Sequence, residues 1–150
     1  MASDVNSARD DAEVQPCANR EKTAKVLAMT RADFAKLVIE AVDELPDEFL
    51  RRLENVEIVV EDEPEPGLLR SLGMDSRRET LFGLYQGTPL HLRDGSYSGV
   101  LPDKISIFFR PLVRAYRSPE RIRAQVRQTV IHEIGHFFGL SDETIRDLGY

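Results

Sequence analysis

The sequence has almost no cysteine and no long apolar run. Only one of its 150 residues is a cysteine, Cys17, so the chain cannot form an internal disulfide, as is typical of proteins from a reducing compartment. No stretch approaches the ~18 consecutive apolar residues of a membrane span. The first residues combine no basic start with an apolar segment, so we expect no secretion signal. These absences predict a cytoplasmic protein that does not enter a membrane.

The net charge of −6 disfavours a general nucleic-acid binder. Six arginines nevertheless lie in one stretch whose only acidic residue is Glu120: Arg110, Arg114, Arg117, Arg121, Arg123 and Arg127. One interpretation is a basic face for an acidic partner or a phosphate backbone. We favour the other, a solvated helix side that faces the acidic region 43–65 of the same chain.

Histidine is also scarce, and two of the three histidines fall in one short motif. Residues 132–142 have the sequence His-Glu-Ile-Gly-His-Phe-Phe-Gly-Leu-Ser-Asp. Residues four apart on a helix lie nearly above one another, so the imidazoles of His132 and His136 can share a metal ion. Glu133 is displaced by about 100° and can reach a water at the metal without being a ligand.

A surface helix is the alternative interpretation of this motif. Apolar residues surround it, which indicates a buried helix end: Val130, Ile131, Ile134, Phe137 and Phe138. Buried imidazoles beside a carboxylate need polar partners, and a metal ion supplies them. Three protein ligands with one exchangeable water are typical of a catalytic zinc site, so we predict Zn²⁺ as the cofactor.

The third ligand must come from the segment after the helix. Gly139 can adopt a positive φ, end the helix and turn the chain back toward the metal. Asp142 follows three residues later and is our predicted ligand, with Glu143 as its rival. Ser141 or Asp142 could instead be the N-cap of a last short helix over residues 141–148. Both roles are compatible if Ser141 caps the helix while Asp142 binds the metal.

The motif resembles the metzincin signature with aspartate as the third ligand, as in snapalysin-like peptidases. Residues 29–150 as a whole are similar to the minimal zincin family of small bacterial metallopeptidases. The shared features outside the motif are Phe34, Leu45-Pro46, the segment 56–60, and residues 84–90 and 101–105. The resemblance implies one zinc ion on His132, His136 and Asp142, with Glu133 as general base. It also implies a peptide or protein substrate.

Hydrophobic periodicity and capping signals predict the other elements. Thr30 and Asp33 can cap a first helix, whose apolar residues recur at helical spacing through Leu45. Ser118 and Pro119 fit the start of the long helix that carries the motif. Between them we expect a short helix from Pro46 to Leu53, a helical turn ending at Gly73, a glycine-rich loop over 87–100, and strands over 56–60, 81–85 and 104–109.

These elements predict an α+β domain over residues 29–150, in which a small mixed sheet packs against the motif helix and the N-terminal helix. Residues 1–28 are polar and have few large apolar side chains, so we expect a disordered tail. In zincins generally, an edge strand above the metal helix binds an extended peptide. Here either 104–109 or 81–85 could be that strand. The sequence does not predict an oligomeric state.

Two functions remain open at this stage. The first is a zinc metallopeptidase. The second is a zinc-binding interaction or regulatory module without catalysis, which is suggested because methionine occurs only at positions 1, 29 and 74, so no methionine turn follows the motif. Glu133 favours the enzyme, because metal binding alone would not require it. Tyr85, His91, Tyr97 and Tyr150 are further candidates for a group that assists the reaction, and the sequence assigns this role to none of them.

Overall fold

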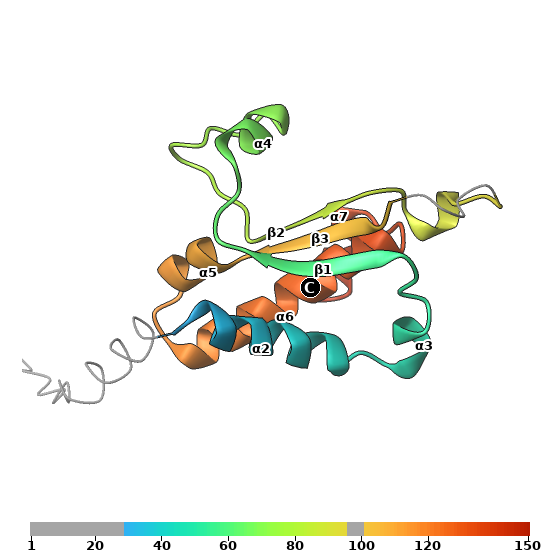
Figure 1. The fold of residues 1–150 in the computed structure, drawn as a ribbon, viewed down its shortest axis with the longest axis horizontal. Coiled ribbons are helices and arrows are strands. Elements are labelled where there is room, and N and C mark those ends of the chain that lie inside the picture. Colours follow the sequence, from blue (N-terminus) through green and yellow to red (C-terminus); the bar gives the residue numbers. More distant parts are fainter. Residues whose placement is uncertain (1–28, 96–100) are drawn as a thin grey trace, which may run out of the picture.

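The structure, a computed structural model, describes residues 29–95 and 101–150. A three-stranded sheet lies over two long helices, α2 and α6, while α4 projects away from them (Figure 1). The elements, in chain order, are α2 (Arg31–Asp43), α3 (Asp47–Leu50), β1 (Val56–Glu61), α4 (Pro66–Ser71), β2 (Gly83–Gln86), the 3-10 turn η1 (Leu90–Leu92), β3 (Asp103–Phe108), α5 (Phe109–Ala115), α6 (Pro119–Phe137) and α7 (Asp142–Asp147). The predicted α+β class with a small mixed sheet is confirmed.

The sheet has the strand order β1-β3-β2. β1 runs parallel to β3, with Ile58 opposite Ile105, and β2 runs antiparallel to it, with Tyr85 opposite Ile105. β3 is therefore the central strand, and residues 104–109 are not the edge strand; that alternative was wrong. Its apolar residues explain the position, because Ile105, Ile107 and Phe108 are fully buried, as expected between two neighbouring strands.

Helix α2 begins where the sequence predicts. Thr30 and Asp33 form a capping box, in which each side chain bonds the other residue's backbone N–H. The helix buries Phe34, Val38 and Ala41. This three-to-four-residue spacing produces one apolar stripe, so α2 has a single face to pack against the rest of the domain.

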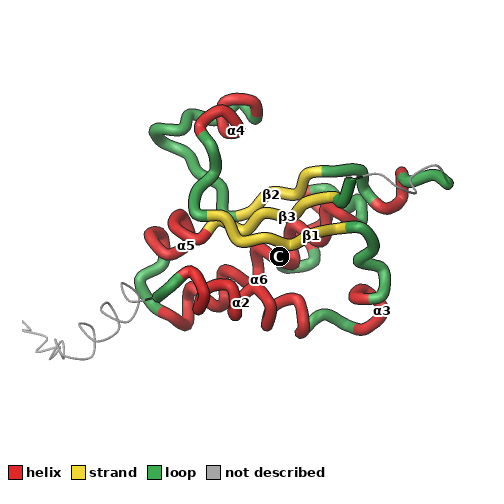
Figure 2. Tube along the Cα trace, viewed as in Figure 1, coloured by secondary structure: helices red, strands yellow, loops and turns green. Residues whose placement is uncertain are grey.

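Helix α6 is the main support of the domain. The Ser118 side chain accepts a hydrogen bond from the Arg121 N–H, and Pro119 occupies the first turn, as predicted. One face of α6 is buried and carries the aliphatic residues Ile122, Val126, Val130 and Ile134. They pack in a single core with Phe34 of α2 and with Ile105 and Ile107 of β3. The domain is thus two layers, with helices on one face of the sheet (Figure 2).

Several boundaries differ from the predictions. Residue 109 begins α5 instead of ending the strand, and the sequence analysis missed this helix because Pro111 and the apolar run before it hide its periodicity. β2 starts at Gly83 and not at residue 81. The predicted glycine-rich loop contains the short turn η1. Pro46 is the N-cap of α3 instead of its first residue. The helical turn that was predicted over residues 68–72 is α4, which begins two residues earlier, at Pro66.

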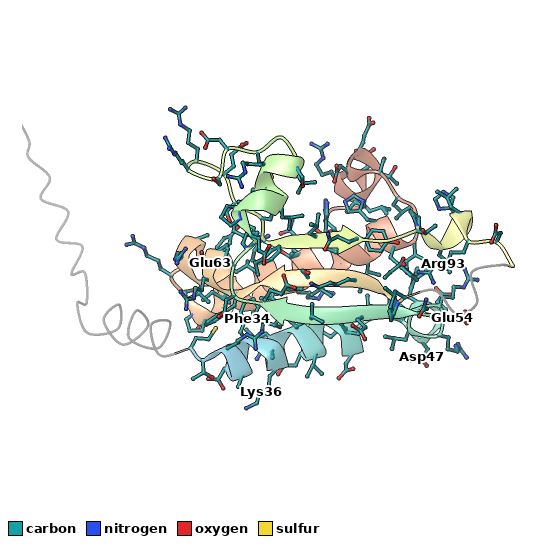
Figure 3. All side chains as sticks on the ribbon, turned by 45° about the horizontal axis from the view of Figure 1, so that its top comes forward. Phe34, Lys36, Asp47, Glu54, Glu63 and Arg93 are labelled. Atoms are coloured by element: carbon teal, nitrogen blue, oxygen red, sulfur yellow. The ribbon has the colours of Figure 1, made fainter. Side chains whose placement is uncertain are left out.

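The arginines of α5 and α6 pair with acidic residues of the same chain. Arg110 and Arg114 lie 4.0 and 2.5 Å from Glu63, Arg127 lies 2.7 Å from Glu44, and Arg123 lies 2.8 Å from Glu40, just outside the expected region (Figure 3 labels Glu63). Within the described residues, Arg117 and Arg121 form no ion pair. All of these side chains are largely exposed, so each pair contributes little to stability.

In residues 29–95 and 101–150, no helix is both long and apolar enough to span a membrane. The predicted tail over residues 1–28, with Cys17, lies outside the described residues.

The packing of α2 predicts a difference between two of its apolar residues. Phe34 is fully buried, whereas Ile39 is 59% exposed. Phe34→Ala should lower the free energy of unfolding by about 3–5 kcal/mol, since it leaves a cavity in the core. Ile39→Ala should change it by less than about 0.5 kcal/mol. Urea denaturation of both variants measures the difference, and equal losses would contradict this description of the core.

Candidate metal centre

The two motif histidines lie one turn apart on α6. Their rings meet edge to face, with centroids 4.8 Å apart, and each side chain is about one quarter exposed. The side of α6 that carries them adjoins the buried aliphatic side, so the packing of the helix also fixes where the imidazoles point.

The end of α6 turns the chain back toward these rings. The helix ends in a Schellman motif, in which the Leu140 N–H donates to the Gly135 carbonyl and the Gly139 N–H donates to the His136 carbonyl. Gly139 has φ of 85°, as its predicted role requires. A Cβ at Gly139 would also lie 2.1 Å from His91 Nδ1, so a larger residue would both strain the backbone and displace the His91 ring.

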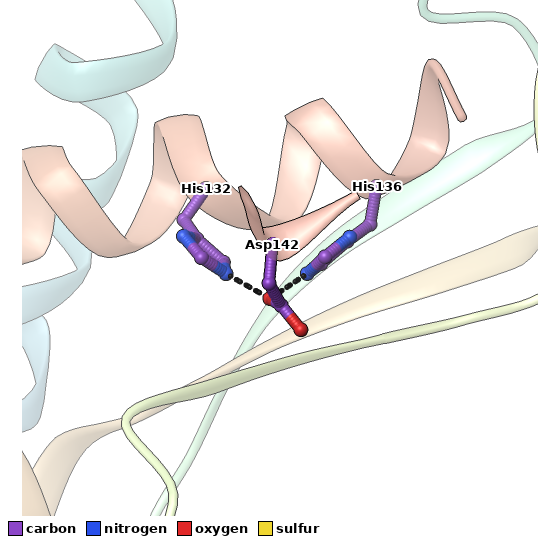
Figure 4. A group of neighbouring side chains, drawn as sticks. All are labelled: His132, His136 and Asp142. Atoms are coloured by element: carbon purple, nitrogen blue, oxygen red, sulfur yellow. Dashed lines mark hydrogen bonds and ion pairs between the residues drawn. The ribbon is translucent and has the colours of Figure 1, made fainter. Parts of the chain in front are cut away.

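Helix α7 then places an aspartate beside both histidines. Ser141 is its N-cap and accepts a hydrogen bond from the Thr144 N–H, so Asp142 is the first helical residue. Asp142 Oδ1 lies 3.0 Å from His132 Nε2 and 3.1 Å from His136 Nε2 (Figure 4). The two alternatives for this segment are therefore compatible, because Ser141 caps the helix while Asp142 faces the histidines. Its rival Glu143 is outside this group.

The donor set fits a tetrahedral metal ion. Its ligand atoms all lie within 4.8 Å of one another, and His132, His136 and Asp142 are the only such group among residues 29–95 and 101–150. Zinc binds imidazole nitrogen and carboxylate oxygen at about 2.0–2.2 Å, which puts ligand atoms about 3.3 Å apart in a tetrahedral site. The observed separations from Asp142 are within a few tenths of an ångström of that value. The predicted ligands are thus brought together; their binding of a metal stays a prediction.

The backbone orients one of the imidazoles. His136 Nδ1 lies 3.0 Å from the Leu140 carbonyl oxygen, to which it can donate. This bond selects the tautomer whose Nε2 lone pair is free to bind a metal, as the second hydrogen bond of a ligating histidine does in metal sites. The turn at Gly139 therefore orients His136 and also returns the chain to Asp142.

The histidines also favour the ionised form of the Asp142 carboxyl. The hydrogen bond from His132 lowers the pKa of the Asp142 carboxyl below its ordinary value. The Asp142 side chain is 67% exposed, so the group opens to solvent on this side.

Glu133 lies beside the three ligands but is anchored elsewhere. Only 8% of the residue is exposed, and its Oε2 accepts a hydrogen bond of 2.9 Å from the Tyr85 N–H of strand β2. Burial raises the pKa of the Glu133 carboxyl, while His136, His132 and the Tyr85 N–H act in the opposite direction. A carboxylate held in this way stays next to the ligand group without belonging to it.

Strand β2 can approach Glu133 this closely because residue 83 is a glycine. A Cβ at Gly83 would lie 2.7 Å from Thr129 Cγ2 and 2.9 Å from Glu133 Cγ, both shorter than real Cβ contacts. Sequence analysis missed this role. Its only signal was a glycine inside a strand pattern, which often marks a close approach of backbone to a neighbour.

A buried polar network supports the same strand from the other side. The Tyr85 hydroxyl donates to Asp103 Oδ2 at 2.5 Å, and Arg93 donates to the same oxygen at 2.6 Å. Asp103 and the Arg93 side chain are 3% and 8% exposed, and burial with this hydrogen bond raises the pKa of Tyr85. Tyr85 is thus hydrogen-bonded through its backbone N–H to Glu133 and through its phenol to Asp103. The sequence signal was an aspartate on the core-facing side of β3.

The other candidates for the reaction have different positions. The Tyr85 phenol is engaged with Asp103, and His91 packs against the turn at Gly139. Tyr150 lines a cleft beside His132. Tyr97 lies outside the described residues.

Comparison with known proteins identifies the family. The model of the zincin-like metallopeptidases matches residues 53–150, which include all the residues of this centre. The chain belongs to the zincin-like metallopeptidase family. This family implies a zinc-dependent hydrolase, and the predicted resemblance to minimal zincins is confirmed.

Among solved structures, the zincin-like chain is similar to a conserved hypothetical protein from T. thermophilus. The two are 24% identical, the match covers 73% of this chain and 94% of the other, and the TM-score is 0.49. No curated protein matches the sequence.

The geometry predicts which variants lose metal. Purified protein supplied with zinc should hold about one ion per chain, and His136→Ala or Asp142→Ala should lower the occupancy at least tenfold at equal free zinc. Glu143→Ala is the matched control, since it removes the neighbouring carboxylate and should leave the occupancy unchanged. Elemental analysis after dialysis measures it. Loss of zinc with Glu143→Ala and not with Asp142→Ala would contradict the assignment.

Proposed function

We propose that this protein is a zinc-dependent metallopeptidase, in which Zn²⁺ is held by His132, His136 and Asp142, and Glu133 is the general base. The observation that carries the proposal is the place of Glu133. It lies beside the ligand group, is bonded to the Tyr85 N–H and is buried, although a site that only bound metal would have no use for it. Membership in the zincin-like metallopeptidase family supports the same reaction class.

The residues of the site have separate roles in the proposed reaction. When bound, zinc supplies a Lewis acid that lowers the pKa of a water toward ~7 and polarises the carbonyl to be cleaved. Glu133 accepts the proton of the attacking water and returns it to the leaving amine. The Tyr85 N–H keeps one Glu133 oxygen fixed, which leaves the other free to bond the water. The exposed side of Asp142 leaves an approach for substrate.

The edge of β2 offers a place for an extended peptide. The Phe108 N–H donates to the Phe82 carbonyl, so residues 82, 84 and 86 direct their backbone groups toward β3. Gly83 and Tyr85 then direct theirs away from it, as the bond from Tyr85 to Glu133 confirms. The Gly83 N–H and the carbonyls of Gly83 and Tyr85 can pair with a substrate backbone by strand addition.

A zinc-binding module without catalysis is the second candidate. A fourth protein ligand would close the coordination sphere and favour it, as in structural zinc sites. The described residues contain three convergent ligands and an open side, so we favour the enzyme.

Replacement of the general base tests the mechanism. Glu133→Gln should lower kcat for peptide hydrolysis at least about 100-fold, since the amide cannot accept the proton. Zinc occupancy should stay at about one per chain, because Glu133 is not a ligand. Peptide-library cleavage followed by mass spectrometry and metal analysis of the same sample measure both. Hydrolysis that survives in Glu133→Gln would rule out this mechanism.

The approach of β2 to α6 gives a second test. Gly83→Ala should force the strand away from Glu133 and lower kcat by about 10- to 100-fold with zinc retained, since small displacements of a catalytic group are costly. Gly67→Ala is the control, because a Cβ there would meet only the end of the Arg70 side chain, at 4.0 Å. Equal activities of the two variants would show that the close contact is irrelevant to catalysis.

A further inference from the structure

A cleft of about 350 Å³ opens beside the metal group, on the His132 side. His132 and Glu133 line it, together with polar residues of α6, the segment before β2 and the end of α7. The residues that matter here are Thr80, Gln125, Gln128, Thr129 and Arg146. Such a cleft is large enough for a side chain of the substrate, and it is lined by Glu133, the proposed general base.

Arg146 is the only arginine or lysine that lines this cleft. Glu133 is the only acidic side chain there, and one of its oxygens accepts a hydrogen bond from the Tyr85 N–H. The acidic residues of α7, Asp142, Glu143 and Asp147, do not line the cleft. The walls are otherwise neutral, with two glutamines and two threonines among them. Arg146 is therefore the one permanently positive side chain that lines the cleft.

The Arg146 side chain forms one hydrogen bond to its own helix. Its Nε donates to the Asp142 carbonyl at 3.2 Å, one turn back on α7. Residues four apart on a helix have Cβ atoms about 5–6 Å apart. The guanidinium therefore lies near the backbone of Asp142, the residue whose carboxylate faces both histidines. A substrate residue next to a carbonyl at the metal can therefore reach the Arg146 guanidinium.

We propose that this cleft selects a carboxylate on the substrate residue next to the scissile bond, and that Arg146 is the residue that binds it. The inference rests on the proposed peptidase function and names its substrate class. Guanidinium groups bind carboxylates by paired, charge-assisted hydrogen bonds. The carboxylate is either an aspartate or glutamate side chain, or the free terminus of a peptide whose last residue is released.

The strand direction says which residue this is. The cleft includes Leu81, Phe82 and Gly83, so it lies at the beginning of β2. Antiparallel pairing is the more stable arrangement. A peptide that adds antiparallel to β2 runs from the Tyr85 end toward the Gly83 end, so the residue after the cleaved bond occupies the cleft. Selection is therefore expected on the leaving-group side.

The test uses the full-length, zinc-loaded protein and a library of peptides blocked at both ends. Matched pairs then differ only after the cleaved bond, with aspartate against asparagine and glutamate against glutamine. The acid should be preferred by about tenfold in kcat/KM. Arg146→Gln should reduce this ratio to about one, and Arg146→Glu should invert it in favour of lysine. Arg70→Gln on α4, which also removes one exposed arginine, should leave the ratio unchanged.

A second arm separates the two sources of the carboxylate. Peptides of neutral residues are compared with a free and with an amidated C-terminus. A preference for the free terminus that Arg146→Gln removes supports the cleft as a site for a terminal carboxylate. A preference for apolar residues, or an acid preference that Arg146→Gln does not alter, would overturn the proposal.

Absence of any cleavage by the wild-type protein would reject the peptidase function, and a binding measurement then decides on the cleft. N-acetyl-aspartate amide and N-acetyl-asparagine amide are titrated into the zinc-loaded Glu133→Gln variant, with the arginine Nε–H signals followed by NMR. Binding of the acid alone, lost when Arg146→Gln is added, supports the carboxylate site. Equal binding with and without Arg146→Gln would mean that the carboxylate binds only at the zinc, and the proposal would fail.

Discussion

The burial of one aliphatic side of α6 is the interaction on which the rest of the structure depends. Val126, Val130 and Ile134 are packed against α2 and the central strand, and this packing fixes the rotation of the helix about its axis. The histidines lie on the adjacent side and Glu133 lies between the two, at the boundary of the core. The same packing therefore makes Glu133 buried while it leaves the imidazoles partly exposed. A rotation of the helix would lose both the core and the site.

Much of the site could be predicted from the sequence because its geometry is local. The helical repeat alone places His132, Glu133 and His136. Only the turn at Gly139 and the N-cap Ser141 separate them from Asp142, so a few backbone angles determine where Asp142 lies. The caps at Thr30 and Ser118 were predictable for the same reason. The fold class followed from the period of the apolar residues, which depends only on neighbours in the chain.

The features that could not be predicted are contacts between residues far apart in the sequence. The bond from Tyr85 to Glu133 spans 48 residues, and the contact of Gly83 with Thr129 exists only because β2 crosses α6 at that point. The order of the strands was ambiguous for the same reason, since the composition of 104–109 suits either a central strand or an edge strand. Helix α5 was missed because a proline and an apolar run obscure its period. Such contacts determine how Glu133 is held, while the motif determines that it is present.

The central claim is an open, three-ligand zinc site with Glu133 outside the ligand group. Anomalous diffraction at the zinc edge from crystals of the zinc-loaded protein tests it most directly. The account predicts a single zinc peak bound by Nε2 of His132, Nε2 of His136 and a carboxylate oxygen of Asp142, with a non-protein ligand in the fourth position and the Glu133 carboxylate still bonded to the Tyr85 N–H. A zinc ion closed by four protein ligands, or one bound directly by Glu133, would contradict it.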